Sequence, residues 1–211
     1  MVTDLIPLFP TPFLRVPKAI ALDQVDALRS RFAPEAAQVN PRSGELTHTT
    51  ILQPSGDPLL EALAETIQPL LVEFGVHLFG ESLTWHIKEL WVNVLRHGGR
   101  QSVHNHANCF ISGVLYLSAC HPSANTLFIR SLGGRDFVFS NMHAQTQLGP
   151  FNAEKWMGPL PSPGDLVLFP SSLLHEVPTN QGDTRVTLAF NAIPHRLDSW
   201  GYSIQLSGSI T

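Results

Sequence analysis

The stretch PSPGDLVLFPSSLLHEVPTNQGDTRVTLAFN, residues 161–191, decides the fold of this chain. Two clusters of turn-forming residues lie at 162–165 and 180–183, and each precedes a segment rich in apolar residues. In the second run polar and apolar residues alternate with a period of two, which is typical of a strand with one apolar face. The polar set is Arg185, Thr187 and Asn191, and the apolar set is Val186, Leu188 and Phe190. We therefore predict strands at 165–169, 175–177 and 185–191.

Further strands are predicted on the N-terminal side of this stretch, each ended by Gly, Pro, Asn or Asp. They fall at 90–95, 102–106, 110–117 and 126–129. Seven or more short strands after a helical segment predict a mainly β protein. The expected fold is a double-stranded β-helix, a jelly-roll or cupin-like barrel formed by residues 84–211.

Residues 1–83 are predicted to be a helical lead-in that packs on the barrel. Residues 22–32 place apolar side chains at a helical spacing, so one helix is expected there. A second helix should begin with Asp57 as its N-cap and Pro58 as its first residue, and Pro69 should kink it. No internal repeat or long linker divides the chain, so we expect a single domain, 1–211.

Composition excludes several classes of function. The 211 residues are 43% hydrophobic and 14% charged, and 17 Pro and 15 Gly supply turns, which argues against disorder. A net charge of −4 with 13 Lys and Arg leaves no basic stripe, so no nucleic-acid partner is expected. No apolar run has the length of a membrane span, and we expect no signal peptide. With only two cysteines, a cytoplasmic location fits best.

Histidines carry the first sign of chemistry. His104 and His106 are two residues apart, and in a strand such residues share a face, so both imidazoles could reach one metal ion. Taken alone, the pair is more often exposed or hydrogen-bonded than metal-bound. His175, on the predicted strand that follows residues 163–170, adds a third candidate ligand and favours a metal site.

Arg185 carries the second sign. An arginine directed into a barrel is costly to bury unless it meets an anion, and a guanidinium binds a carboxylate with two parallel hydrogen bonds. Thr187 could donate a further hydrogen bond to the same group. The alternative is a structural ion pair with one of three nearby acids. These are Asp165, Glu176 and Asp183.

With these residues in view, the sequence resembles the 2-oxoglutarate and iron(II)-dependent oxygenases, in particular bacterial and phage members akin to prolyl 4-hydroxylases. The resemblance rests on four stretches. They are LFPTPF at 8–13, WVN at 91–93, HNHANCFISGVLYL at 104–117 and the opening stretch at 161–191. The last is the most specific, because it combines the turn, the strand, the histidine and the arginine at the family's spacing.

The resemblance implies a non-haem iron(II) dioxygenase that hydroxylates an unidentified substrate with O2 and 2-oxoglutarate as co-substrate, releasing succinate and CO2. It assigns His104, His106 and His175 as iron ligands and Arg185 as the residue that binds the far carboxylate of 2-oxoglutarate. Further contacts to the co-substrate are expected from two residues besides Arg185 and Thr187. They are Tyr116 and Asn93, the latter at the rim of the site.

The departure from the family pattern is at His106, where the family has Asp or Glu. Three neutral imidazoles leave about +2 formal charge on the iron site, one more than two histidines and a carboxylate. An iron dioxygenase that does not use 2-oxoglutarate therefore stays open, as does a non-catalytic jelly-roll binding protein with a structural metal. The substrate, small-molecule or peptidyl, should be contacted by loops such as 131–161. A homodimer is left open.

Overall fold

The computed structural model describes residues 4, 6–41, 43–131 and 143–206. Its two α-helices are α1 (Leu22–Phe32) and α2 (Pro58–Phe79), as the sequence predicts, and two short 3-10 helices span Ala33–Glu35 and Pro122–Ala124. The described strands are β1 Leu14–Val16, β2 Gln38–Val39, β3 Ser43–His48, β4 Trp85–His104, β5 Ile111–Tyr116, β6 Leu127–Ile129, β7 Lys155–Met157, β8 Leu166–Pro170, β9 Leu174–Val177, β10 Arg185–Pro194, β11 Arg196–Ser199 and β12 Tyr202–Gln205.

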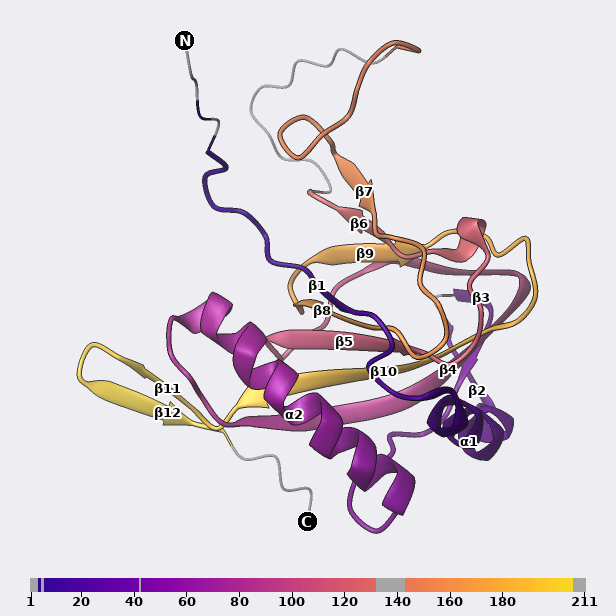
Figure 1. Ribbon diagram of the computed structural model, residues 1–211, viewed down its shortest axis with the longest axis horizontal. Coiled ribbons are helices and arrows are strands. Elements are labelled where there is room, and N and C mark those ends of the chain that lie inside the picture. Colours follow the sequence, from indigo (N-terminus) through magenta and orange to yellow (C-terminus); the bar gives the residue numbers. More distant parts are fainter. Residues whose placement is uncertain (1–3, 5, 42, 132–142, 207–211) are drawn as a thin grey trace.

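The main sheet is antiparallel and curls on itself. Its strand order is β1-β8-β5-β10-β4-β9-β6-β7, and the other side of β4 also pairs with β3. The 20 residues of β4 join the two layers, because its first half pairs with β10 whereas His104 at its end pairs with His175 of β9. In Figure 1 β9, β6 and β7 lie above the layer of β5, β10 and β4, and β11–β12 forms a separate projecting hairpin.

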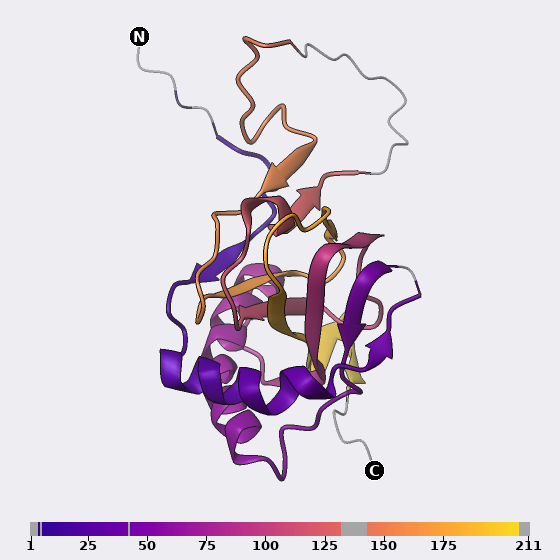
Figure 2. The same cartoon turned by 90° about the vertical axis from the view of Figure 1, so that its right-hand side faces the viewer.

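Both helices cover the outer face of the larger layer (Figures 1 and 2). Asp57 caps α2 as predicted, since its Oδ1 accepts hydrogen bonds from the backbone N–H groups of Leu59 and Leu60 at 3.0 and 3.4 Å. Gly80 ends this helix in the left-handed conformation, with φ of 69°. Pro69 lies inside α2, which continues past it as one element.

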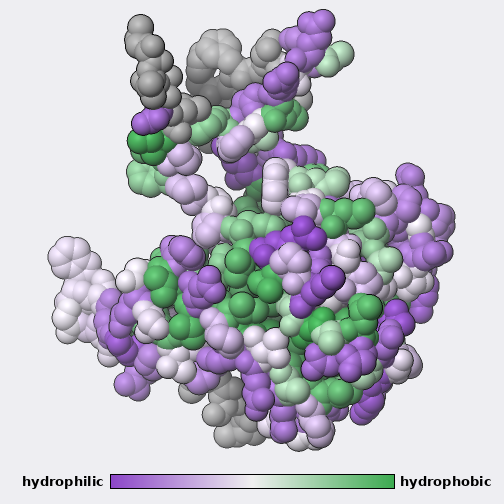
Figure 3. Space-filling view, in the orientation of Figure 1, coloured by the Kyte–Doolittle hydropathy of each residue, from purple (hydrophilic) through white to green (hydrophobic). Residues whose placement is uncertain are grey.

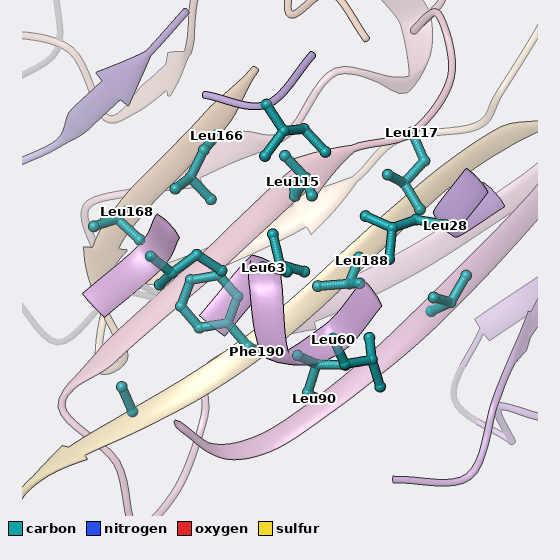
Figure 4. Close-up of a cluster of buried hydrophobic side chains, with 14 of the residues drawn as sticks. Leu28, Leu60, Leu63, Leu90, Leu115, Leu117, Leu166, Leu168, Leu188 and Phe190 are labelled. Atoms are coloured by element: carbon teal, nitrogen blue, oxygen red, sulfur yellow. The ribbon is translucent and has the colours of Figure 1, made fainter. Parts of the chain in front are cut away.

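The core lies between these helices and the sheet. Figure 4 shows Leu28 of α1, Leu60 and Leu63 of α2, and Leu188 and Phe190 of β10 in one cluster. The alternation predicted for β10 is confirmed, because its apolar residues pack in this core. Its polar residues lie on the opposite face and are buried inside the curl of the sheet.

The lead-in contributes strands as well as helices. β1 extends the sheet beyond β8, and β3 pairs with β4. Sequence reading missed them because Leu14–Val16 is only three residues long and Ser43–His48 has a single buried residue, Leu46. Neither described helix combines the length and the apolar character that a membrane crossing demands.

The N-terminal tail and the β6–β7 arm project from the body of the protein on the same side. Hydrophobic residues lie on both (Figure 3), among them the exposed Leu8, Phe9, Leu148 and Phe151. A cavity of about 700 Å³ opens between the two segments.

The close contact between β5 and β10 yields a test of the packing. A Cβ added at Gly113 would overlap the ring of Phe190, its cross-strand partner in the core. We therefore expect Gly113→Ala to lower the free energy of unfolding by about 1–3 kcal/mol, measured by urea denaturation. Gly44→Ala, where the added Cβ meets nothing within 4 Å, is the control and should change it little. Equal effects of both substitutions would contradict this packing.

Candidate active site

A row of aromatic rings crosses the smaller layer. Trp156 of β7 pairs with Phe128 of β6, Phe128 with His175 of β9, and His175 with His104 of β4. Directly opposed residues share a face of a sheet, so all four side chains start from the same face. The Phe169 ring of β8, 4.9 Å from that of His175, packs against this row.

Three histidines meet at the end of this row. One potential ligand atom from each of His104, His106 and His175 lies within 4.8 Å of the others. Their ring centroids are 4.2 Å apart for His104 and His175, 5.0 Å for His106 and His175, and 5.2 Å for His104 and His106. The structure thus brings together the three histidines that the sequence singled out.

The expected reason for their proximity is wrong in one respect. β4 ends at His104, so His106 is not on the same strand. The backbone leaves the β4–β9 pairing here, and the N–H of His106 donates to the carbonyl of Ser171 at 2.9 Å. The His106 ring reaches the cluster from this connecting segment rather than through the alternation of one strand.

Hydrogen bonds orient all three imidazoles. Nδ1 of His104 lies 2.8 Å from the carbonyl oxygen of Ser102, and Nδ1 of His175 lies 2.8 Å from that of Leu173. A carbonyl oxygen can only accept, so in both rings Nδ1 carries the proton and Nε2 keeps its lone pair, to which in His104 the side-chain amide of Gln101 donates at 3.2 Å. This is the arrangement in which histidine binds a metal.

Burial keeps these rings neutral. It lowers the pKa of His175 to about 3, and the neighbouring His104 adds to the lowering. Burial also lowers the pKa values of His104 and His106. At neutral pH the three imidazoles are therefore uncharged, which is the form that binds a metal.

Arg185 is buried on the inner face of β10, with 5% of its surface exposed. Its Nη2 lies 3.4 Å from Oγ1 of Thr126, its guanidinium carbon lies 5.1 Å from the ring centre of Tyr116, and its Nε has no hydrogen-bond partner. The N–H group on Nε of Arg185 is therefore left to donate to a ligand.

None of the three acids considered from the sequence pairs with Arg185. Asp165 pairs with Arg15 at 2.8 Å, Glu176 pairs with Lys155 at 3.4 Å, and Asp183 is exposed. Across the described part of the chain, no carboxylate lies within ion-pair distance of Arg185. The structural ion pair is thus not formed there, and a buried cation faces the interior without an anion.

The other predicted co-substrate residues form a second row. Asn93 of β4, Thr187 of β10 and Tyr116 of β5 oppose one another across three strands. All three are buried, and Oδ1 of Asn93 accepts a hydrogen bond from Nε1 of Trp91 at 3.2 Å. This row lies next to Arg185 on the same face of β10.

The short segment 126–128 connects the surroundings of Arg185 with those of His175. Phe128 opposes His175, and Thr126, two residues earlier in the chain, contacts Arg185. Two residues of extended chain span roughly 7 Å.

Sequence reasoning missed two residues of this site. Thr126 contacts both Arg185 and Tyr116, but a threonine at a strand end gives no signal of its own. Glu89 accepts a hydrogen bond from Nδ2 of Asn191 at 2.8 Å, and Oδ1 of that amide lies 2.7 Å from Nδ1 of His106. Glu89 could have been found from the sequence, because it lies two residues before Trp91 and four before Asn93 and so shares their face of the strand.

The loop expected to contact substrate is described only in part, because residues 132–142 lie outside the described part of the chain. Its described portion lines the cavity of about 700 Å³, together with Phe13 and Phe128. The Phe128 ring lies 6.1 Å from that of His175. The cavity thus shares one wall with the histidine cluster.

Comparison with protein families gives a match for residues 89–191, to the family described as "Putative 2OG-Fe(II) oxygenase". The match begins at Glu89, ends at Asn191 and includes all three histidines and Arg185. A search of curated protein sequences gave no match to this chain.

Three solved structures of similar shape illustrate the likeness. HygX from Streptomyces hygroscopicus, with nickel and 2-oxoglutarate bound, has a TM-score of 0.63 at 14% identity, covering 87% of this chain and 83% of HygX. A Pseudomonas putida prolyl-4-hydroxylase has 0.57 at 18%, covering 86% and 92%. The collagen prolyl hydroxylase of Paramecium Bursaria Chlorella virus-1 has 0.58 at 11%, covering 85% and 94%. At these identities the likeness shows the fold, and the predicted double-stranded β-helix is confirmed.

The lowered pKa of His175 predicts a pH dependence of stability. An unfolded histidine has a pKa near 6.5 and folded, metal-free His175 one of about 3, so between these values only the unfolded state binds the proton. Stability is therefore fully present above pH 6.5. It falls as the pH drops toward 3, by at most about 1.4 kcal/mol per pH unit for this group.

Urea denaturation of the metal-free protein between pH 7 and pH 4.5 measures this dependence. His175→Gln should flatten it by close to one proton, whereas His97→Gln, which changes an exposed histidine, should leave it as in the wild type. Identical slopes for the wild type and His175→Gln would show that burial does not suppress protonation of His175.

Proposed function

We propose, from the family match over residues 89–191, that this chain is a 2OG-Fe(II) oxygenase, a non-haem iron(II) enzyme that hydroxylates an unidentified substrate with O2 and 2-oxoglutarate. One observation carries the proposal. The same barrel interior holds a cluster of three neutral imidazoles and, a short step away, a buried guanidinium with no anionic partner among the described residues.

The histidine cluster suits iron. Three imidazoles oriented through Nδ1 favour a borderline transition metal, whereas calcium and magnesium prefer oxygen ligands. Within the described residues no fourth His, Cys, Asp or Glu joins the cluster, so the donor set leaves coordination positions for other ligands. His104, His106 and His175 are the iron ligands in this proposal.

Arg185 is the proposed binding site for the distal carboxylate of 2-oxoglutarate. Its Nε and Nη2 can donate to that carboxylate in parallel, and Thr187 and Tyr116 offer hydroxyl groups from the adjoining row. Thr126 holds Nη2 from the other side. Asn93, in the row with Thr187, is oriented by Trp91 and is the remaining contact in this proposal.

Bound iron(II) supplies the oxygen chemistry in which one O2 oxidises 2-oxoglutarate to succinate and CO2 and a C–H group of the substrate to an alcohol. The protein contributes orientation and dryness. Arg185 fixes one end of the co-substrate, and the rings of Phe128 and Phe169 exclude water beside His175.

Two other functions were left open by the sequence. An iron dioxygenase without 2-oxoglutarate is disfavoured, because the buried Arg185 has no anionic partner among the described residues and the distal carboxylate of 2-oxoglutarate would supply one. A non-catalytic protein with a structural metal requires a closed set of four ligands, and the described residues offer three.

The substrate region in this proposal is the cavity between the N-terminal tail and the β6–β7 arm. Its lining mixes aromatic and proline residues with Arg130 and Lys155, so it suits a small molecule or a peptide segment. A cytoplasmic location and the absence of nucleic-acid and membrane partners remain predictions, and a homodimer stays open.

The iron-loaded protein should consume O2 and form succinate when 2-oxoglutarate is present, and do neither without it. His175→Gln should lose both the bound iron, measured by elemental analysis, and succinate formation. His97→Gln is the control and should keep both. Iron content that is equal in the wild type and His175→Gln would remove the histidine cluster as the metal site, and O2 consumption independent of 2-oxoglutarate would favour the other dioxygenase.

Arg185→Ala should weaken 2-oxoglutarate binding while leaving iron in place. Truncating one partner of a buried charge-assisted pair costs about 2–5 kcal/mol, and Arg185→Lys should recover part of this loss because it keeps the charge but not the two-pronged geometry. Calorimetric titration of 2-oxoglutarate into the anaerobic iron-loaded protein measures both effects.

Arg15→Ala is the matched control, because Arg15 pairs with the buried Asp165. It should lower thermal stability and leave the affinity for 2-oxoglutarate unchanged. A result in which Arg185→Ala behaves like Arg15→Ala would assign Arg185 a structural role, and wild-type protein that binds no 2-oxoglutarate would overturn the co-substrate assignment.

A further inference from the structure

His106 is oriented differently from the other two histidines. Peptide carbonyls fix the rings of His104 and His175, whereas Nδ1 of His106 lies 2.7 Å from the side-chain oxygen of Asn191. Asn191 is buried, with 3% of its surface exposed. Oγ of Ser112 lies 2.8 Å from the same Nδ1, so side chains orient the third imidazole, and the direction in which the Asn191 amide points is part of that orientation.

Glu89 determines how that amide points. Its Oε2 lies 2.8 Å from Nδ2 of Asn191, and a carboxylate can only accept, so the NH2 group must face Glu89 and the amide oxygen must face His106. Ser112 supports the same orientation, since its hydroxyl donates to Oδ1 of Asn191 at 2.8 Å. His106 must then hold its proton on Nδ1, which leaves Nε2 for a metal.

The local backbone places Glu89 for this contact. Glu89 opposes Asn191 across β4 and β10, and Asn191 opposes Ser112 across β10 and β5. The β4–β10 register shifts immediately afterwards, because Ala192 pairs with Ile87 and Lys88 is left as the extra residue of a bulge. Bulges of this kind redirect side chains beside functional sites.

Glu89 is an anion in this setting. Burial acts to raise its pKa, but the hydrogen bond from Asn191 and the ion pair with Lys88, 3.0 Å away, outweigh burial and lower it. A negative charge thus stands one hydrogen-bonded amide away from the imidazole that occupies the position of the family's carboxylate ligand.

We propose that Glu89 is a positioning residue for the metal centre, which acts through Asn191 to hold Nε2 of His106 toward the metal and supplies, from outside the coordination shell, the negative charge that a carboxylate ligand would have brought. This inference rests on the proposed metal site. In this proposal the relay Glu89–Asn191–His106 supplies both a ligand atom and a negative charge. Where the ligand is Asp or Glu, one side chain supplies both.

The physical reason lies in the charge of the centre. A divalent ion on three neutral imidazoles keeps about +2 formal charge in a buried site, where uncompensated charge is costly. An anion that polarises the Nδ1–H of one ligand through a hydrogen-bonded chain makes Nε2 of that ligand a better donor. The other two histidines have only neutral peptide carbonyls behind them.

Cobalt(II) titration of the metal-free full chain, followed by visible absorption, tests the relay without any turnover. Glu89→Gln keeps the size of the side chain but removes its charge and its obligatory acceptor role, so the affinity for cobalt should fall roughly 10–100-fold, with a shifted visible spectrum. Glu176→Gln is the matched control. Glu176 adjoins His175 in sequence but starts from the opposite face of β9 and pairs with Lys155, so its loss should leave affinity and spectrum unchanged.

A second substitution should restore what the first removes. In the variant Glu89→Gln with Asn191→Asp, the glutamine NH2 can donate to the new carboxylate, which then accepts directly from Nδ1–H of His106. Affinity for cobalt should return most of the way to the wild-type value. Loss of packing alone would not be repaired by this exchange.

The outcomes separate the relay from the metal site itself. Wild-type protein that binds no cobalt, or a His175→Gln variant that binds it as well as the wild type, would overturn the metal site. A site that binds cobalt equally in the wild type and Glu89→Gln would overturn the relay alone. Nitrogen-15 NMR of the metal-free wild type adds a check that needs no variant: a His106 ring protonated on Nε2 would also overturn the relay.

Discussion

The two-residue alternation of β10 is the constraint on which the rest of the structure depends. Val186, Leu188 and Phe190 must pack against the helices, so the residues between them have to point into the curl of the sheet. A polar side chain turned inward is tolerable only if it finds a partner. Asn191 finds partners in Glu89 and Ser112, whereas Arg185 has a free Nε.

The interior of the barrel is consequently polarised along its length. At one end a permanent cation is buried without a counter-ion among the described residues, and at the other three neutral imidazoles converge. Between the two lies an apolar row in which Val114 of β5 opposes Ala189 of β10. A metal ion together with a dianion satisfies both ends at once, which is why neither half of the site makes sense alone.

The sequence was sufficient for the bounds of α1, for the start of α2, for most strands and for the four side chains at the two ends of the site, because these depend on periodicity and on residue type. It was insufficient wherever a contact between distant strands decides the outcome. Glu89 and Asn191 are 102 residues apart, and Thr126 and Arg185 are 59 apart, so only strand register brings each pair together. His106 shows the converse: its ring is in the predicted place, although the backbone that carries it is not in the predicted strand.

The course of β4 has a consequence for how the barrel comes apart. This strand carries Glu89 near its start and His104 at its end. Because the strand bends from the larger layer to the smaller one, His104 belongs to the histidine cluster and Glu89 is connected to it through Asn191. His175 reaches the cluster from β9, which is held to β4 by a short and irregular pairing. A bound metal is thus a cross-link between two layers that the backbone alone joins weakly. Without the metal, we expect local unfolding to cost less free energy and to begin with the separation of β9, β6 and β7, while the helices stay packed on β5 and β10.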